Sequence, residues 1–279
     1  YVGGTEHAVL HLLYARFWHK VLYDLGSVST PEPFFKLVNQ GLILGEDGQK
    51  MSKSRGNVVN PDDVLVEYGA DAFRLYEMFM GPLQDTKPWN TKGVEGVYRF
   101  LGRVWRLFVD ETTGEFSSAL TDEAPDETSL RALHKLIQKV SVEVEQLKLN
   151  TAIAAIFDFV NVLTPMERRP RAVLEPFVLV IAPFVPHLAE ELWARLGHGE
   201  SLAYEPWPDY DETLARDDAV EIAVQVGGKI RSRVMVAADA AEQTIQDAAM
   251  ADEKVRTAIA GKTVRKVIVV KGRLVNIIV

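Results

Sequence analysis

The sequence predicts a multidomain α+β protein that is mainly helical, and three observations support this. The length of 279 residues corresponds to about two domains. Apolar residues recur with a helical spacing through the middle of the chain. Near residue 219 the pattern changes to strict alternation, which is typical of strands. Changes in pattern along the chain divide it further, and we expect four segments, at residues 1–60, 61–92, 93–218 and 219–279.

Composition excludes several classes of protein. Hydrophobic residues make up 47% of the chain and charged residues 25%, which is ordinary for a globular protein and unlike a disordered or collagen-like one. The chain has no cysteine, so it has no disulfide, no thiolate metal site and no cysteine nucleophile. No apolar run is long enough to cross a membrane. The sequence opens without Met or a secretory leader, and we expect it to be the C-terminal part of something larger.

Charge is unevenly distributed along the chain. The net charge is −8, but the last 61 residues carry +4 and the first 218 carry −12. A basic module on an acidic body suggests that the module has an anionic partner. A mixed solvated surface explains the charges about equally well.

Residues 1–60 are predicted to contain a helix, a strand and a loop. The helix is expected over residues 5–24, with one apolar stripe formed by Val9, Leu12, Leu13, Phe17 and Val21. A short apolar run within residues 34–44 suits a buried strand. The polar, glycine-containing residues 45–60 indicate a loop.

Helices are predicted from residue 61 onward. Asn60 and Pro61 form a strong helix start, because asparagine caps helices and proline suits the first helical position. Gly69 ends this helix, and a second one follows at about 70–80. An antiparallel helical bundle is then expected, with helices at 93–109, 128–148, 150–163, 171–182 and 186–196.

Two details of the bundle follow from local sequence. Residues 113–126 are rich in small, polar and acidic side chains and are predicted to be a linker. Asn150 and Thr151 are predicted to cap the helix that begins there.

The C-terminal segment is predicted to be a small ββαββ module. Gly227 and Gly228 separate two alternating runs, which is a hairpin signal. The elements are expected at 221–226 and 229–236 for the hairpin, 242–259 for the helix, and 264–270 and 274–279 for the last two strands, with a turn at 271–273.

The sharpest functional signal is KMSKS at residues 50–54, followed by Arg55, Gly56 and Asn57. Two lysines three positions apart, with hydroxyl groups near them, suit a mobile clamp on phosphates, because lysine offers a flexible point charge. Such charges stabilise negative charge that develops on a transferring phosphate. From composition alone, a solvated basic loop is the alternative.

A second signal is GGTEH at residues 3–7, which leads into the first predicted helix. Paired glycines permit close backbone approach, and a helix N-terminus favours anions. The carboxylate of Glu6 could accept hydrogen bonds from ribose hydroxyls. A turn with a capping acid is the alternative.

His7 and His11 lie four positions apart on one predicted helix face. Zinc ligation is not favoured, because Ala8 stands where the HExxH motif has glutamate and the chain has no cysteine. A pocket lining or a structural pair explains them better.

Arg99, Arg103 and Arg106 are predicted to lie on one helix face, beside Trp105. This face is a candidate track for nucleic-acid phosphates. The alternative is a face balanced by nearby acids such as Glu95.

Together these stretches resemble the bacterial leucyl-tRNA synthetases, which are class I enzymes, and the resemblance runs along the whole chain. KMSKS is specific for class I synthetases, and GGTEHAVLHLLYARF is closer to the leucine enzyme than to its valine, isoleucine or methionine relatives. The stretches that carry the resemblance are YVGGTEHAVLHLLYARFWHKVL, KMSKSRGNVVNPDDVLVEYGADAFRLYEMFMGP, PFVPHLAEELW, VQVGGKIRSRV and VRKVIVVKGRLVNIIV.

The resemblance implies a fold for each segment. Residues 1–60 would be the second half of the catalytic nucleotide-binding, Rossmann-like domain. Residues 61–92 would be connecting helices of the stem-contact type. Residues 93–218 would be a tRNA-binding helical bundle of the anticodon-binding type, and residues 219–279 a C-terminal α/β domain that contacts tRNA.

The resemblance also implies an activity and its residues. Leucine would be activated by ATP, with Mg²⁺, to leucyl-adenylate and transferred to tRNA(Leu) in the cytoplasm. Lys50 and Lys53 would be catalytic, and His7 and His11 would line the leucine pocket. The residues expected to bind ATP are Gly3, Gly4, Glu6, His7, Leu42, Ile43, Met51, Ser52 and Ser54. Those expected to bind tRNA are Arg99, Arg103, Arg106, Lys229, Arg231, Arg265, Lys266, Lys271 and Arg273. No residue is expected to be a metal ligand.

Two departures from the family pattern matter. The H-x-G-H motif of class I enzymes is absent, so the chain is expected to be inactive without an N-terminal half that carries it. Only residues 45–49 separate the predicted strand from KMSKS, which leaves no room for a domain that some relatives insert there.

Two rival functions stay open on sequence. The first is a non-catalytic tRNA-binding module or subunit, against which the intact KMSKS segment argues. The second is a synthetase of the valine or isoleucine type, which the absence of cysteine and the compact C-terminal module disfavour.

Overall fold

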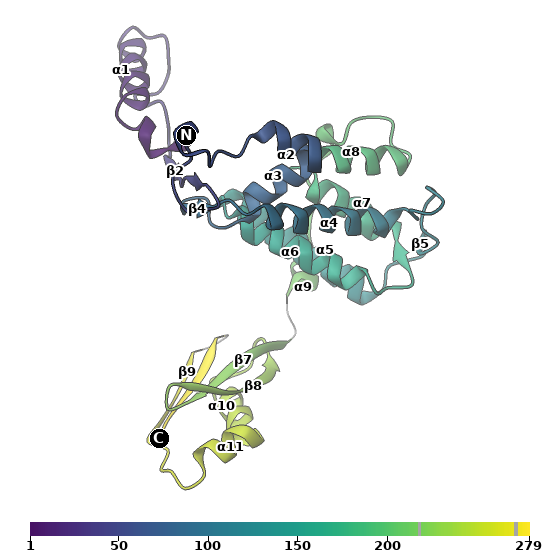
Figure 1. Ribbon diagram of the computed structural model, residues 1–279. Coiled ribbons are helices and arrows are strands. Elements are labelled where there is room, and N and C mark those ends of the chain that lie inside the picture. The colour runs from purple at the N-terminus through teal and green to yellow at the C-terminus, as the bar shows by residue number, and fades with distance from the viewer. Residues whose placement is uncertain (217–218, 271–272) are drawn as a thin grey trace. The chain divides into compact units, whose positions relative to one another are not determined.

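The computed structural model describes residues 1–216, 219–270 and 273–279. The chain divides into two compact units, residues 1–215 and 216–279 (Figure 1). No helix within the described ranges is long and apolar enough to cross a membrane. The turn predicted at 271–273 lies partly outside the described residues, because they do not include Lys271 and Gly272.

The N-terminal part of the first unit consists of short strands and one helix. Strand β1 (Val2–Gly4) pairs in parallel with β2 (Val38–Gln40). The single helix predicted over residues 5–24 is wrong at its start, because Thr5–His7 form a 3-10 turn (η1) and helix α1 runs from His11 to Asp24. No residue of α1 is buried, and the predicted apolar stripe therefore lies at the surface.

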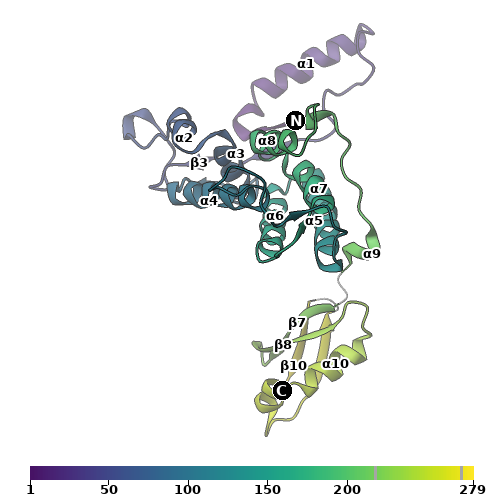
Figure 2. The same cartoon turned by 90° about the vertical axis from the view of Figure 1, so that its right-hand side faces the viewer.

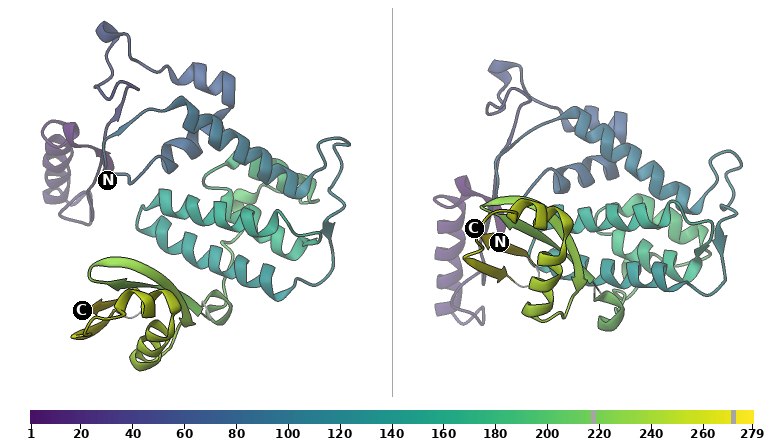
Figure 3. Two further views of the ribbon diagram at one scale, coloured as in Figure 1. Left: turned by 60° about the horizontal axis from the view of Figure 1, so that its bottom comes forward. Right: turned by 90° about the horizontal axis from the view of Figure 1, so that it is seen from below.

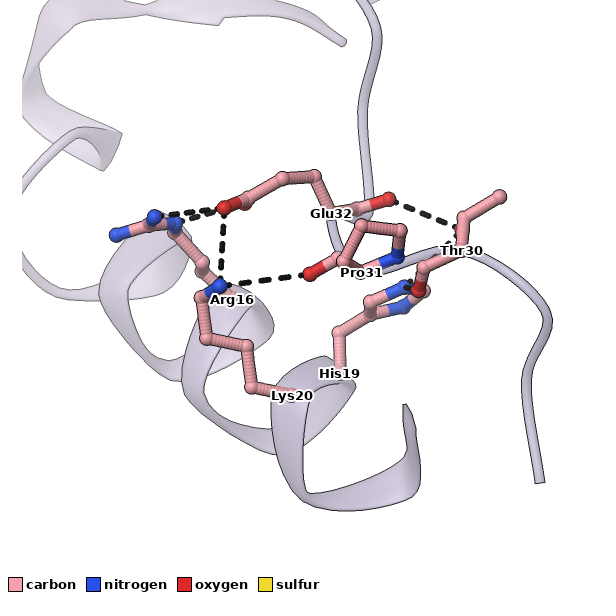
Figure 4. A network of polar contacts seen from close by, with 6 residues as sticks. All are labelled: Arg16, His19, Lys20, Thr30, Pro31 and Glu32. Atoms are coloured by element: carbon pink, nitrogen blue, oxygen red, sulfur yellow. Dashed lines mark hydrogen bonds and ion pairs between the residues drawn. The ribbon is translucent and has the colours of Figure 1, made fainter. Parts of the chain in front are cut away.

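Polar contacts hold the segment after α1 against the helix (Figure 4). Arg16 forms two hydrogen bonds of 2.7 Å with the Glu32 carboxylate, and Lys20 Nζ lies 3.0 Å from the same group. His19 Nε2 lies 2.7 Å from the backbone oxygen of Thr30. The hydrogen bonds from Arg16 and Lys20 lower the pKa of Glu32 to about 2. Charge, rather than an apolar core, closes this loop.

The buried strand predicted within residues 34–44 is two short strands. Strand β2 ends at Gln40, and β3 (Ile43–Leu44) pairs in parallel with β4 (Lys87–Pro88). Only Val38 is buried in these two strands. The strands have different partners, and the chain passes between them at Gly41, where a Cβ atom would collide with the backbone of Asp85. A continuous strand could not make both pairings.

The helix start at Asn60 and Pro61 is confirmed. Helix α2 (Pro61–Tyr68) begins there, and the Asn60 side chain accepts a hydrogen bond of 3.3 Å from the Asp62 N–H group. Gly69 has a φ of 85°, which ends α2 and begins α3 (Ala70–Phe79).

The bundle helices lie close to their predicted positions. They are α4 (Thr91–Phe108), α5 (Glu127–Glu145), α6 (Leu149–Leu163), α7 (Arg171–Ile181) and α8 (Pro186–Arg195). Helices α5 and α6, in teal, lie side by side in Figure 3. Together with α2 and α3 the bundle encloses one core, in which Phe108, Phe177 and Phe184 are fully buried. Packing of these helices dominates the first unit.

The linker predicted at 113–126 does connect α4 to α5, and it contains one short strand, β5 (Leu120–Thr121), which pairs in parallel with β6 (Arg169–Pro170). The cap predicted for the next helix is wrong. Asn150 and Thr151 do not cap α6, which begins one residue earlier and has no side-chain cap. The Thr151 hydroxyl instead donates to the Glu143 carboxylate at 2.7 Å. After α8 the chain continues through a 3-10 turn, η3 (Leu202–Tyr204), and a short helix, α9 (Glu212–Ala215).

The second unit is a four-stranded sheet with two helices packed on it (Figure 2). The strand order is β8-β7-β10-β9, in which β10 pairs in parallel with β7. The elements are β7 (Ala219–Val226), β8 (Lys229–Ala237), α10 (Glu242–Ala251), α11 (Glu253–Ile259), β9 (Lys266–Val270) and β10 (Leu274–Ile278). The predicted hairpin is confirmed, since Gly227 and Gly228 have φ values of 58° and 79° between β7 and β8.

The single helix predicted over residues 242–259 is wrong. Asp252 has an extended backbone and separates α10 from α11. Its carboxylate accepts hydrogen bonds from the Val255 N–H group at 3.0 Å and from the Ser232 hydroxyl at 2.8 Å. The aspartate thus starts a new helix and ties it to β8.

Candidate functional site

The KMSKS segment lies on a hairpin-like loop. The loop opens after β3, where the Gly45 N–H group donates to the Gln49 oxygen at 2.9 Å and Leu44 bridges to Lys50. Gly56 closes it with a left-handed φ of 68°. Between them, Lys53–Arg55 form one 3-10 turn (η2).

Asn57 holds this loop together. Its Oδ1 atom accepts a hydrogen bond of 2.9 Å from the Ser52 N–H group. Its Nδ2 group donates to both carboxylate oxygens of Asp47, at 3.1 and 3.2 Å, and lies within 3.5 Å of the Gln49 and Lys50 backbone oxygens. One amide side chain therefore joins both arms of the loop.

The two lysines of the KMSKS segment are open to solvent. Lys50 and Lys53 are exposed, and neither forms an ion pair or side-chain hydrogen bond among the described residues. The Ser52 and Ser54 hydroxyls lie 3.2 Å apart. Met51 packs instead against the core of the first unit. The loop thus presents two cations without an ionic partner and two hydroxyl groups, and the Asn57 side chain holds its backbone.

The GGTEH segment has a different geometry. Gly3 and Gly4 are buried on β1, opposite Asn39 and Gln40. A Cβ atom on Gly4 would collide with the carboxylate of Glu6, so this glycine lets the exposed carboxylate fold back over the strand. The two glycines leave room for the side chains of Tyr1 and Glu6, and close approach of a ligand to their backbone stays a prediction.

The two histidines next to this segment lie near each other. The rings of His7 and His11 have centroids 6.0 Å apart, and the His11 ring lies 5.7 Å from that of Tyr1. His7 Nε2 is 3.9 Å from the Glu6 carboxylate. Among the described residues, no group of three or more acidic or histidine side chains could hold a metal ion.

A cleft of about 490 Å³ lies between Thr5 of the GGTEH segment and strand β2 with the residues on either side of it. Thr5, Val38, Gln40, Leu42 and Thr86 are among its lining residues. The backbone of Leu42 is held on both sides, since its oxygen accepts from the Lys87 N–H group at 2.9 Å and its N–H group donates to the Thr86 hydroxyl at 3.4 Å. No hydrogen bond or ion pair within the described ranges connects this region to residues 50–54.

The three arginines of α4 are not equivalent. Arg103 donates to Asn161 at 2.6 Å, and Arg106 forms an ion pair of 3.0 Å with Glu111. Arg99 has no such partner in the described part of the chain. All three line a groove of about 850 Å³ that also contains the Asp71–His187 pair. Arg99 is therefore the arginine of this face that is free to meet a phosphate.

The basic residues of the second unit are spread over its surface. Lys229, Arg231, Arg265, Lys266 and Arg273 are all exposed, and Lys271 lies outside the described residues. Arg231 lines a cleft of about 580 Å³ with Lys254 and Lys262, two lysines that the sequence reasoning did not select. Residues 219–279 contain no Phe, Trp, Tyr or His, so base stacking on an aromatic ring is not available to this unit.

Sequence reasoning missed Asn57, Asp47 and Glu46. Asn57 was visible three residues beyond KMSKS, and a polar residue that follows a turn glycine is a usable signal. The two acids precede the motif and look like an ordinary polar turn. Asp47 binds Asn57, as described above, and Glu46 binds Thr91. These pairings are visible only in the fold.

Two family models match the chain. Residues 14–87 match the family described as tRNA synthetases class I (I, L, M and V), and residues 126–246 match the anticodon-binding domain of tRNA ligase. The chain therefore has a class I tRNA synthetase-like fold, mainly helical with small sheets.

Two relatives and one solved structure that are similar to this chain are leucine enzymes by name. Leucine–tRNA ligases from two strains of Leptospira biflexa serovar Patoc are 55% identical to this chain over 280 residues, which is 100% of this chain and 32% of each relative. The crystal structure of the ternary complex of Agrobacterium radiobacter K84 agnB2 LeuRS, tRNA and LeuAMS has a TM-score of 0.72 and 33% identity, covering 100% of this chain and 38% of that one. The resemblance to the leucyl-tRNA synthetases is confirmed, and this chain spans about a third of the length of the relatives it matches.

Proposed function

We propose that this chain is the C-terminal portion of a leucyl-tRNA synthetase, which activates leucine with ATP and transfers it to tRNA(Leu). The observation that carries the proposal is the pair of uncompensated lysines, Lys50 and Lys53, on a loop held by Asn57. The identity to leucine–tRNA ligases along the whole chain supports it. An N-terminal half would supply the remainder of the active site, and the chain alone would be inactive.

Each of the four segments would have its own role in the enzyme. Residues 1–60 would complete the nucleotide-binding domain, and residues 61–92 would connect it to the bundle. Residues 93–218 would bind tRNA as an anticodon-binding-type bundle, and residues 219–279 would contact tRNA as a separate domain. The separation of the second unit near residue 216 supports the last boundary.

Lys50 and Lys53 would neutralise the ATP triphosphate while the leucine carboxylate attacks the α-phosphorus. Leucyl-adenylate forms and pyrophosphate leaves, with no covalent enzyme intermediate, so positioning and charge carry the rate. The Ser52 and Ser54 hydroxyls, together with the backbone at Met51, would bind the same phosphates. Mg²⁺ would arrive with ATP, because the described residues offer phosphate-binding cations rather than a carboxylate cluster.

The adenosine end of ATP would bind at the other edge of the site. Glu6 would accept from the ribose hydroxyls, since Gly3 and Gly4 allow close approach there. Leu42 and Ile43 would border the adenine, which the cleft next to Leu42 supports. His7 and His11 would line the pocket for the adenylate and leucine.

The tRNA would be bound chiefly through phosphates and shape. Arg99 would make the main contact of α4, with Arg103 and Arg106 beside it. The residues proposed for the second unit are Lys229, Arg231, Arg265, Lys266, Lys271 and Arg273. Because this unit lacks aromatic rings, its contribution should be charge-dependent, and binding should weaken steeply with salt.

The test is leucine-dependent ATP–pyrophosphate exchange by the full-length enzyme. Lys53→Ala should reduce exchange by about 10²- to 10³-fold, the usual effect of removing one group that stabilises transition-state charge. Arg55→Ala removes an exposed cation from the same loop and is the matched control; it should change exchange by only a few fold. Equal activity of Lys53→Ala and wild type would refute the proposed role.

A second measurement separates the proposal from a non-catalytic tRNA-binding module. Deleting residues 216–279 should reduce aminoacylation more than leucine activation. A full-length protein that binds tRNA but shows no exchange with leucine would favour the binding module. Exchange with isoleucine or valine instead would overturn the assignment of leucine.

A further inference from the structure

The N-terminus of helix α4 is capped by a residue far away in sequence. Asn90 occupies the cap position, but its side chain makes no capping hydrogen bond. Instead the Glu46 carboxylate accepts hydrogen bonds from the Thr91 N–H group at 3.0 Å and from the Thr91 hydroxyl at 2.8 Å. These bonds lower the pKa of Glu46, which keeps it ionised where the positive end of the helix favours an anion.

This end of α4 is rigidly supported. The hydroxyl of Tyr76 accepts a hydrogen bond of 2.9 Å from the Asn90 N–H group. The Trp89 indole N–H group donates to the Thr91 hydroxyl at 3.1 Å. Both aromatic side chains are only 5% exposed. Glu46 is therefore attached to a fixed point of the bundle core.

The neighbouring carboxylate faces the KMSKS segment. Asp47 accepts from the Gln49 N–H group at 3.0 Å and from Asn57, which in turn holds the Ser52 N–H group. The hydrogen bonds from Gln49 and Asn57 lower the pKa of Asp47. Two consecutive acids thus connect the start of α4 to the backbone of residues 50–54.

Gly45 shows that this arrangement is tightly built. It is buried, and a Cβ atom there would lie 2.7 Å from Asp47 Oδ1 and 2.9 Å from Asn57 Nδ2. Any larger residue would have to displace the Asp47–Asn57 pair. Glycine at this position therefore leaves room for the Asp47–Asn57 pair.

We propose that Glu46 and Asp47 are positioning residues that fix the KMSKS loop relative to helix α4. Glu46 fastens the turn at 45–49 to the bundle, and Asp47 holds the loop backbone through Asn57. The lysines that meet the triphosphate are thereby set in place by the same helix that carries Arg99. This inference rests on the proposed function.

The link has a specific kinetic consequence. Without the contacts of Glu46 and Asp47, Lys50 and Lys53 are still present but no longer held in position. The affinity for ATP and the rate of leucine activation should therefore fall. Among the described residues, Glu46 has no hydrogen bond or ion pair with His7 or His11, the residues proposed for the leucine pocket, so the KM for leucine should be unchanged. A mere loss of folded protein would lower all activities together.

The experiment uses the full-length enzyme with Glu46→Ala, Glu46→Gln and the control Asp63→Ala. Asp63 is an exposed carboxylate of α2 with no hydrogen bond or ion pair among the described residues. Glu46→Ala should raise the KM for ATP in pyrophosphate exchange about tenfold, the usual weight of hydrogen bonds to a charged group. Glu46→Gln keeps an acceptor oxygen and should stay within about threefold of wild type.

A double variant tests whether the link acts as one unit. Combining Glu46→Ala with Asp47→Ala should raise the KM for ATP little more than either change alone, because both break the same connection. Multiplied effects would overturn the proposal, as would a KM for ATP in Glu46→Ala equal to that of Asp63→Ala. An equal rise in the KM for leucine would reduce Glu46 to a structural role. Absence of leucine-dependent exchange in the wild type would instead refute the proposed function.

Discussion

Arg169 stabilises the ends of two helices at once. Its Nε and Nη2 atoms donate to the backbone oxygens of Leu163 and Thr164, at 3.1 and 3.0 Å, where α6 ends. Its Nη1 atom lies 3.4 Å from the oxygens of Arg106 and Leu107 in the last turn of α4. The guanidinium is half-buried, and burial lowers its pKa. A cation is thus placed where two helix dipoles have their negative ends.

Replacing Arg169 by methionine should destabilise the first unit substantially. Hydrogen bonds from a charged donor contribute about 1.5–3 kcal/mol each. Two of the four contacts are 3.0–3.1 Å long and the other two are 3.4 Å, and water can replace part of what is lost at a half-buried site. We therefore expect the free energy of unfolding to fall by about 3 kcal/mol. Arg169→Lys keeps the charge but not the fork of donors, so it should recover only part of this loss.

Urea unfolding followed by tryptophan fluorescence measures this effect. All five tryptophans lie within residues 1–215, so the signal reports on the first unit alone. Arg168→Met is the matched control, because the side chain of the neighbouring Arg168 is 70% exposed and, in the described part of the chain, pairs only with Glu123. The control should lose less than about 1 kcal/mol. Equal losses in the two variants would refute the reasoning.

Two further predictions concern the pKa of Glu32 and the space around two glycines of α4. The Glu32 carboxyl has a pKa lowered to about 2, so its contacts with Arg16 should be complete above the ordinary pKa of about 4.5 and disappear as the pH falls towards 2. Carbon-detected NMR titration should place its midpoint near 2, and Arg16→Gln should move it back up; an ordinary midpoint in the wild type would contradict this. Gly93→Ala should destabilise α4 by about 1–3 kcal/mol, because a Cβ atom there lies 2.6 Å from the Tyr76 ring. Gly96→Ala, on the same helix with open space around it, should instead stabilise by about 0.5–1 kcal/mol in thermal or urea unfolding.

Local signals in the sequence predicted most elements, and the errors have both local and long-range causes. Asn60 and Gly227 act through their own neighbours, so the helix start and the hairpin could be read directly. Asp252 is also a local signal, which the single-helix prediction overlooked, because its carboxylate caps α11 through the Val255 N–H group three positions on. Thr151 is different, because its hydroxyl binds Glu143 of the preceding helix instead of capping α6.

In the candidate site, too, some residues are evident from the sequence and others only from the fold. The KMSKS motif and the paired glycines are recognisable because their residue types are the ones that the proposed chemistry requires. Arg103 and Arg106 look equivalent to Arg99 in sequence. Only the fold reveals that Arg103 donates a hydrogen bond to Asn161 and that Arg106 forms an ion pair with Glu111. Glu46 could not be identified as a cap, because its partner lies 45 positions away.

The strand order of the second unit has a consequence for how that unit folds. The β7–β8 hairpin joins neighbouring segments and can form early, whereas β10 must find β7 across some fifty positions, as the pairing of Leu274 with Ala223 requires. Closing such a loop costs entropy before any pairing compensates for it. Folding of this unit should therefore be limited by the search for the central parallel pair, with rates typical of mixed α/β domains rather than of helical bundles. Until β10 arrives, the inner edge of β7 is open, and that interval is when the unit is most exposed to wrong strand pairing.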